Sequence, residues 1–221
     1  MGKFIILEGI DASGKTTAVH NVVKALQNSG IKTIGINKKN ISFSSCHING
    51  FMNYLSSYLW DGNNKLSNDI SSSDWLFLFS IWLETLDCNW IQDKLNEYQI
   101  VIVDSWYYKI LARFLTKRRK ECEKFKHFFD KVTKGDNVFM IDCKPEICWN
   151  RRKVFYQTEL GFEIKAEDKR SHFISFQSKV RRILLDFSHE NEKWFVINAD
   201  RLTEDEVCKN IVNKIFKDVL R

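Results

Sequence analysis

The segment from Gly9 to Thr17 constrains this 221-residue chain more than any other. Residues 9–16 read Gly-x-x-x-x-Gly-Lys-Thr and follow an apolar run of strand type that ends at Glu8. Glycines let the backbone approach an anion closely, and successive N–H groups can then point at it. A helix that begins directly after the turn adds the positive end of its dipole. The order strand, turn and helix therefore predicts a phosphate-binding loop.

The residues after the turn support this prediction. Apolar side chains recur at helical spacing from Val19 to Leu26. In a loop of this kind Lys15 reaches the β- and γ-phosphates, and the hydroxyl of Thr16 binds Mg²⁺. The alternative, a glycine turn without a ligand, is disfavoured by this context. The predicted nucleotide-binding residues of the loop are Gly9, Asp11, Ala12, Ser13, Gly14, Lys15, Thr16 and Thr17.

The overall charge narrows the classes of partner. The chain has a formal net charge of +6, which suits a protein that handles polyanionic nucleotides. Nucleic acid would favour the same sign of charge, but no interleaved aromatic and basic motif of an RNA-binding type is present. We therefore expect a small nucleotide as the substrate and no nucleic acid as a partner.

The cysteines and the apolar segments indicate in which cellular compartment the protein acts. Six cysteines include no Cys-x-x-Cys pair and no Cys/His spacing of a zinc site, so reduced thiols are expected. The N-terminus runs directly into a strand, so we expect no signal peptide. The most apolar stretch, residues 75–83, is much shorter than the roughly 20 residues that span a membrane. The sequence predicts a soluble cytoplasmic protein without a membrane partner.

Strand-like and helix-like segments alternate along the chain, which predicts a parallel sheet flanked by helices. The length fits one α/β domain, residues 1–221, with an inserted lid at about residues 151–168, where polar residues surround Gly161. The predicted strands are residues 3–8, 32–37, 100–104, 137–142 and 194–198. The predicted helices are residues 14–29, 45–60, 71–97, a segment ending at 115, 121–133, one that begins at 145, 168–189 and one that begins near 203.

An acidic residue ends the predicted central strand. Residues 100–104 are four apolar residues followed by Asp104. Phosphoryl transfer needs a metal ion that is bridged to the phosphates and oriented by an acid near the loop. We therefore predict that Thr16 and Asp104 hold Mg²⁺. A role for Asp104 as a helix N-cap is the alternative, and it is compatible with metal binding.

The loop resembles that of thymidylate kinases through Phe4-Ile5-x-x-Glu8-Gly9-x-Asp11-x-Ser13-Gly14-Lys15-Thr16-Thr17. Looser similarities are Asp142-x-x-Pro145-Glu146 followed by Arg151-Arg152, then Phe176-x-x-Lys179-Val180-Arg181, and Val196-Ile197-Asn198-Ala199. The resemblance implies a P-loop kinase fold with a short lid, and ATP and Mg²⁺ as cofactors. It also implies that Asp11 contacts a sugar hydroxyl of the acceptor, and that Asn198 and Ala199 lie at the adenine.

The chain departs from the family where an acceptor phosphate would be held. Ser105 and Leu83 stand at or near arginine positions of the family, and residues 37–40 replace an Arg-Glu-Pro-Gly motif. Serine and leucine cannot copy the bidentate grip of arginine on phosphate. The candidate replacements are Lys38, Lys39 and Lys109. Each of them is alternatively an ordinary surface lysine.

The remaining candidate site residues are lid cations and aromatic side chains. Ala12 gives the loop no arginine of its own. In family members of this type the lid supplies the catalytic positive charge, which implies roles for Arg151, Arg152 and Lys165. Lys15 and Asp104 complete the predicted catalytic set. Phe79 and Trp82 in the predicted long helix are candidates for acceptor binding, although aromatic residues in such helices are more often core.

Three functions remain open from the sequence alone. The favoured hypothesis is an ATP-dependent kinase of a nucleoside monophosphate, with conversion of dTMP to dTDP as the expected reaction. A kinase of an unphosphorylated nucleoside or another hydroxyl acceptor is the first alternative, although the carboxylate that such kinases use after the second strand is absent. A nucleotide-binding regulatory protein without catalysis is the second. A homodimer formed through the apolar long helix is also open.

Overall fold

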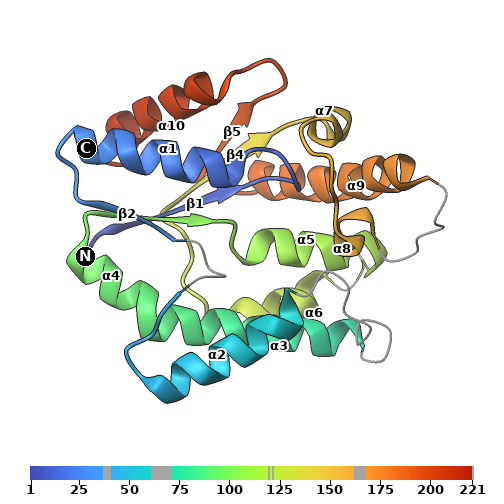
Figure 1. The fold of residues 1–221 in the computed structure, drawn as a ribbon, viewed down its shortest axis with the longest axis horizontal. Coiled ribbons are helices and arrows are strands. Elements are labelled where there is room, and N and C mark those ends of the chain that lie inside the picture. The colour runs from blue at the N-terminus through green and yellow to red at the C-terminus, as the bar shows by residue number, and fades with distance from the viewer. Residues whose placement is uncertain (37–40, 61–70, 119, 121, 162–167, 221) are drawn as a thin grey trace.

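A parallel five-stranded sheet forms the centre of the molecule (Figure 1). The computed structural model describes residues 1–36, 41–60, 71–118, 120, 122–161 and 168–220. The strands are β1 (Lys3–Glu8), β2 (Thr33–Ile36), β3 (Ile100–Asp104), β4 (Asn137–Asp142) and β5 (Trp194–Asn198). Their order across the sheet is β2-β3-β1-β4-β5, and every neighbouring pair is parallel. The predicted sheet is confirmed, and only β2 is shorter than expected.

Helices cover both faces of this sheet (Figure 1). They are α1 (Lys15–Asn28), α2 (Cys46–Leu59), α3 (Ser72–Leu86), α4 (Gln92–Glu97), α5 (Tyr107–Arg118), α6 (Cys122–Lys126), α7 (Pro145–Asn150), α8 (Gln157–Leu160), α9 (Lys169–His189) and α10 (Glu204–Asp218). Helices α1 and α10 pack on one face, and α5 and α9 lie together on the other with α3 beyond α5. The chain thus has the predicted layered α/β architecture.

The sequence of β1 explains the two cores. Successive side chains of a strand point to opposite faces of a sheet. Phe4 and Ile6 pack into the core shared with α3, α5 and α9, whereas Ile5 and Leu7 pack into the core shared with α1 and α10. All four are at most 1% exposed. Burial on both faces requires the continuous apolar run that the sequence shows.

The long helix predicted for residues 71–97 contains a π-helical segment. Ser71 caps the N-terminus of α3 in a capping box with Asp74, and α3 continues through a π-helix, Asp87–Ile91, into α4. Within this segment the buried carboxylate of Asp87 accepts hydrogen bonds from the N–H of Thr133 at 2.6 Å and from Gln92 Nε2 at 2.9 Å. The wider turn of the π-helix thus accompanies a hydrogen bond to a residue 46 positions away and one within the same helical stretch.

One other helical prediction is corrected at its end, and the predicted lid is described only in part. The helix predicted for residues 121–133 is shorter, because α6 passes into a 3₁₀ turn at His127–Phe129. In the predicted lid the structure describes the single-turn helix α8, whereas residues 162–167 lie outside the described part. None of the described helices is long and apolar enough to cross a membrane.

Candidate active site

The loop between β1 and α1 has a conformation that only particular residues can adopt. Gly9 has φ +148°, and a Cβ there would lie 2.6 Å from the carbonyl oxygen of Ile141 and 2.7 Å from Ser13 Oγ. Gly14, the N-cap of α1, has φ +98°, and Ala12 has φ 61°. Side chains disfavour such φ values, and the clash at Gly9 excludes any Cβ. The glycines of the motif are therefore required by the turn itself.

Lys15 lies folded over this loop. Its residue is only 7% exposed, and Nζ donates a hydrogen bond of 2.6 Å to the carbonyl oxygen of Ile10. Burial lowers the pKa of Lys15, and the nearby ammonium of Lys109 lowers it further, against the opposing effect of Asp104. A buried ammonium at the helix N-terminus favours the binding of an anion in the loop, because the anion would offset the cost of desolvating the ammonium.

Two oxygen-bearing side chains, one in the first turn of α1 and one at the carboxyl end of β3, meet beside the loop. Thr16 Oγ1 donates a hydrogen bond of 2.5 Å to Asp104 Oδ2, and both residues line a cavity of about 460 Å³ between α1 and β2. No group of three or more His, Cys, Asp or Glu side chains among the described residues could hold a metal alone. Mg²⁺ typically keeps several waters and binds one or two protein oxygens together with substrate phosphates. Thr16 and Asp104 therefore fit Mg²⁺ bound together with a nucleotide.

The residue after Asp104 turns inward and does not face the loop. Ser105 has φ 63° and is 3% exposed, and its Oγ donates to Glu8 Oε2 at 3.0 Å. The N–H of Trp106 donates to the other oxygen of Glu8 at 2.8 Å. Leu83 is completely buried in the core. The two positions at which the family resemblance implied arginines therefore offer no cation to an acceptor.

Cations from α5 surround Asp11 instead. Lys109 Nζ lies 2.8 Å from Asp11 Oδ1, and an Nη atom of Arg113 lies 3.9 Å from Oδ2. Burial alone would raise the pKa of Asp11, but Lys109, Arg113 and Lys15 together hold it far below its usual range. Gln177 Nε2 also donates to Oδ2 at 2.9 Å. Asp11 is therefore an ionised carboxylate with one hydrogen-bond donor at each oxygen, which leaves acceptor capacity on both.

Arg113 and Gln177 belong to the candidate site but are not among the residues predicted from the sequence. Arg113 follows Lys109 by four residues, so helical spacing alone could have placed both on one face of α5. Gln177 lies 166 residues from Asp11, and no local pattern distinguishes it from other polar residues of α9.

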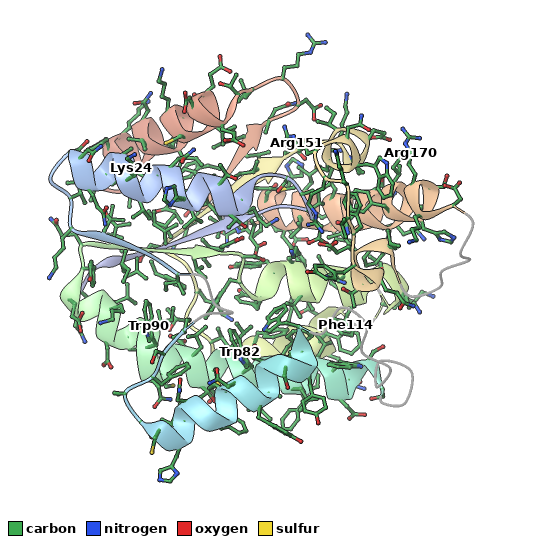
Figure 2. The ribbon with its side chains drawn as sticks, viewed as in Figure 1. Lys24, Trp82, Trp90, Phe114, Arg151 and Arg170 are labelled. Atoms are coloured by element: carbon green, nitrogen blue, oxygen red, sulfur yellow. The ribbon has the colours of Figure 1, made fainter. Side chains whose placement is uncertain are left out.

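The two predicted lid arginines have different partners. Arg151 reaches from the end of α7 to the loop, where it donates to the carbonyl oxygens of Ser13 and Ala199, each at 3.1 Å (Figure 2). Arg152 binds both carboxylate oxygens of Glu159 in α8, at 3.0 and 2.6 Å. Of these two arginines, only Arg151 is therefore in contact with the phosphate-binding loop.

The predicted adenine residues lie at the end of β5, beside the loop. The N–H of Ala199 donates to the carbonyl oxygen of Asp142 at 2.7 Å, while its own carbonyl is held by Arg151. Asn198 accepts a hydrogen bond from the N–H of Asp200. The structure thus brings Asn198 and Ala199 to the same edge of the sheet as the loop.

The predicted acceptor aromatics belong to a cluster in the helical layer. Trp82 is 2% exposed, and its ring lies 5.8 Å from that of Trp60. Phe79 is half-buried and lies 5.3 Å from Trp60 and 6.5 Å from Phe114. Both roles stay predictions, as does that of Thr17 in the first turn of α1. The predicted cations Lys38, Lys39 and Lys165 lie outside the described residues.

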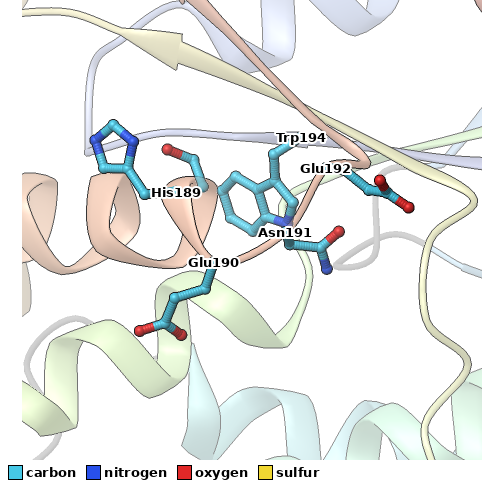
Figure 3. Close-up of a pocket in the computed structure, with 6 residues that line it drawn as sticks. His189, Glu190, Asn191, Glu192 and Trp194 are labelled. Atoms are coloured by element: carbon cyan, nitrogen blue, oxygen red, sulfur yellow. The ribbon is translucent and has the colours of Figure 1, made fainter.

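A second hollow, of about 600 Å³, lies at the turn between α9 and β5 (Figure 3). Its lining includes His189, Glu190 and Trp194. This turn precedes β5, so it lies at the amino ends of the strands, whereas the phosphate loop lies at their carboxyl ends. Ligands of parallel sheets bind at the carboxyl ends. No predicted site residue lines this hollow, which leaves the loop as the candidate active site.

Comparisons with known proteins identify the family of the chain. The family model described as thymidylate kinase matches residues 7–211. Curated thymidylate kinases from Brachyspira hyodysenteriae, Plasmodium falciparum and Prochlorococcus marinus are 26%, 28% and 29% identical to the chain. The alignments cover 97%, 100% and 98% of this chain, and 93%, 90% and 99% of those proteins.

A solved structure supports the same fold. The thymidylate kinase of Candida albicans superposes with a TM-score of 0.66 over 98% of this chain and 92% of that one, at 19% sequence identity. The fold resemblance is therefore independent of high sequence similarity. Because the family model begins inside β1 and ends inside α10, and so spans nearly the whole described architecture, the chain belongs to the thymidylate kinase family.

Proposed function

We propose that this protein transfers the γ-phosphoryl group of ATP to dTMP and releases dTDP and ADP. Membership of the family makes the chain an ATP- and Mg²⁺-dependent nucleoside monophosphate kinase. The observation that carries the proposal is the meeting of Thr16 and Asp104 at 2.5 Å beside the phosphate-binding loop. Phosphoryl transfer depends mainly on positioning and on electrostatic stabilisation, which such a constellation can supply.

In the proposed mechanism residues 9–17 bind the triphosphate of ATP. Lys15 would compensate the charge of the moving phosphoryl group, and Thr16 and Asp104 would hold Mg²⁺. The metal, when bound, neutralises charge on the phosphate oxygens. Arg151 already contacts the loop, and Arg152 is the second lid cation in the proposal. Asn198 and Ala199 would bind the adenine.

The proposed acceptor site lies on the other side of Asp11. Asp11 would accept a hydrogen bond from a sugar hydroxyl of dTMP, and Lys109 would face the monophosphate. The 2.8 Å ion pair of these two residues supports their placement at one site. Phe79 and Trp82 are proposed to contact the base, and Lys38 is proposed as a further cation.

A kinase of an unphosphorylated acceptor is the second candidate function. The observation that favours it is the inward orientation of Ser105, whose hydroxyl binds Glu8, together with the burial of Leu83. Without arginines at these positions, the affinity for a monophosphate depends on the cations of α5. The two candidates therefore make opposite predictions about which acceptors react.

A panel of acceptors separates them. Release of ADP is measured with ATP, Mg²⁺ and each of the common nucleosides and nucleoside monophosphates, and the phosphorylated product is identified by mass spectrometry. We expect dTMP to have the highest kcat/KM, with that of thymidine lower by about 100-fold or more, because the site would be built to bind the phosphate that thymidine lacks. Turnover of nucleosides alone would refute the proposed function and establish the second candidate.

We further propose that the chain acts as one kinase domain with a lid at about residues 151–168, and that it acts in the cytoplasm without a nucleic-acid partner. The five cysteines that the structure describes are all free, which supports a reducing compartment. A homodimer is also proposed, through the face of α2 in place of the long helix that the sequence suggested, because Phe51 and Tyr54 of α2 are 48% and 67% exposed.

A further inference from the structure

A buried glutamine links the phosphate loop to the lid. Gln177, in the middle of α9, has no exposed surface. Its Nε2 donates to Asp11 Oδ2 at 2.9 Å and to the carbonyl oxygen of Glu159 at 2.8 Å, while its Oε1 accepts from the N–H of Asp11 at 3.2 Å. These partners determine the orientation of the amide, because two acceptors face the nitrogen and one donor faces the oxygen.

A second side chain, that of Arg113, also links Asp11 to helix α8. Arg113 donates a hydrogen bond to the carbonyl oxygen of Thr158, and its guanidinium lies 3.9 Å from Asp11 Oδ2. The guanidinium also packs over the ring of Phe176, 5.6 Å from its centroid. Two consecutive carbonyl groups of α8 are thus bound by the two side chains that also contact the carboxylate of Asp11.

Helix α8 in turn holds a lid arginine. The buried carboxylate of Glu159 binds the guanidinium of Arg152 through two hydrogen bonds. A helix of one turn has too few internal hydrogen bonds to be stable alone. Its position therefore depends on outside contacts, of which Gln177 and Arg113 supply two to its backbone.

We propose that Gln177 and Arg113 are positioning residues that fix helix α8, and through Glu159 the guanidinium of Arg152, relative to Asp11. This inference rests on the proposed function, in which Asp11 binds the acceptor and Arg152 acts on the transferred group. A displacement of about 1 Å in a reacting site can reduce the rate by about 100-fold. The two links thus hold Asp11, on the acceptor side, and Arg152, in the lid, in a fixed position relative to each other.

The variant Gln177→Met tests the inference, because methionine keeps the length of the side chain and removes its amide. We expect kcat to fall about 10- to 100-fold, with KM for ATP changed by less than about threefold. Gln92→Met is the matched control, since Gln92 also binds two partners, Asp87 and Thr133, but lies outside the site. The control should retain the kcat of the wild type.

Hydrogen exchange provides a readout that needs no turnover. The amides of residues 157–161 should exchange faster in Gln177→Met and in Arg113→Met than in the wild type, and remain unchanged in Gln92→Met. The double variant Gln177→Met/Arg113→Met should lose less kcat than the product of the two single losses, because both links act through α8.

Two results would overturn the inference: wild-type kcat in a folded Gln177→Met protein, or reduced kcat with wild-type exchange at residues 157–161. If Gln177→Met fails to fold, Arg113→Met decides between the same outcomes. A wild-type protein that phosphorylates no monophosphate would refute the proposed function instead, and the exchange comparison would still establish or refute the links to α8.

Discussion

The side chain of Asp11 is only 11% exposed, and the cations Lys15, Lys109 and Arg113 surround it. Removal of one partner of a buried ion pair leaves the other charge without compensation, and this costs about 3–5 kcal/mol. We therefore expect Asp11→Asn to lower the free energy of unfolding by about that amount. Urea denaturation at pH 7 measures it.

The double variant Asp11→Asn/Lys109→Met is the control for this prediction. Because it removes both charges, it should recover a large part of the stability that Asp11→Asn loses. If the double variant were as unstable as the single one, the loss would come from packing around residue 11 and not from the uncompensated charge of Lys109.

The same carboxylate predicts a dependence of stability on pH. Its pKa is lower in the folded than in the unfolded protein, so its contribution is fully present above the unfolded value of 3.8 and is lost as the pH falls further. The free energy of unfolding of the wild type should therefore decrease below about pH 4, more steeply than that of Asp11→Asn. Denaturation series at pH 5, 4 and 3 test this, and parallel curves for the two proteins would contradict it.

Lys15 is expected to serve catalysis at the expense of stability. Its pKa is lowered by burial, so the folded protein disfavours its charged form. Lys15→Met should reduce kcat by about 1,000-fold or more, as loss of a group that stabilises transition-state charge does, without reducing the melting temperature. Kinetics and calorimetry on the same preparation check both halves, and a stable variant with normal kcat would refute the role of Lys15.

At the scale of elements, the π-helix between α3 and α4 predicts a stability effect remote from the site. Asp87 is 3% exposed and accepts hydrogen bonds from Gln92 and from the backbone of Thr133. Asp87→Ala leaves a buried N–H without its acceptor, so we expect a loss of about 1–3 kcal/mol. The variant should keep wild-type KM values, because the loop lies elsewhere. Chemical denaturation with parallel kinetics measures both quantities.

Elements were predictable from sequence where local chemistry decides them. The bounds of β4 and β5 match the prediction because each is a compact run of strand-forming residues, and the capping box at Thr203 marks the start of α10 correctly. The π-helix was not predictable. Its carboxylate binds Thr133, 46 residues away, and a helical hydrophobic pattern does not record such a contact.

In the candidate site, too, the residues set by local sequence were predictable and those set by distant contacts were not. The loop, Thr16 and Asp104 follow from a local motif and from the parallel order of β1 and β3, which places their carboxyl ends together. Gln177 could not be found in this way, because its role exists only through contacts with residues 11 and 159. Long-range hydrogen bonds leave no periodic signal in a single sequence.

At the scale of the whole molecule, the homodimer is the remaining prediction. Helix α2 buries Met52, Leu55 and Leu59 against the protein, yet its opposite side presents Phe51, Tyr54 and Tyr58 to solvent. An amphipathic surface helix normally carries polar residues on that side. Exposed apolar stripes of this kind mark interaction surfaces. We therefore expect two copies to associate through α2, as isologous interfaces allow.

Sedimentation equilibrium should give twice the chain mass of 26.2 kDa for the wild type and the chain mass itself for Phe51→Glu/Tyr54→Glu, because the association would bury four carboxylates. The matched control is Phe216→Glu on α10, where the phenylalanine is 40% exposed but isolated from this stripe. It should remain dimeric. A monomeric wild type would refute the dimer, and dissociation of both variants alike would show that the interface does not depend specifically on α2.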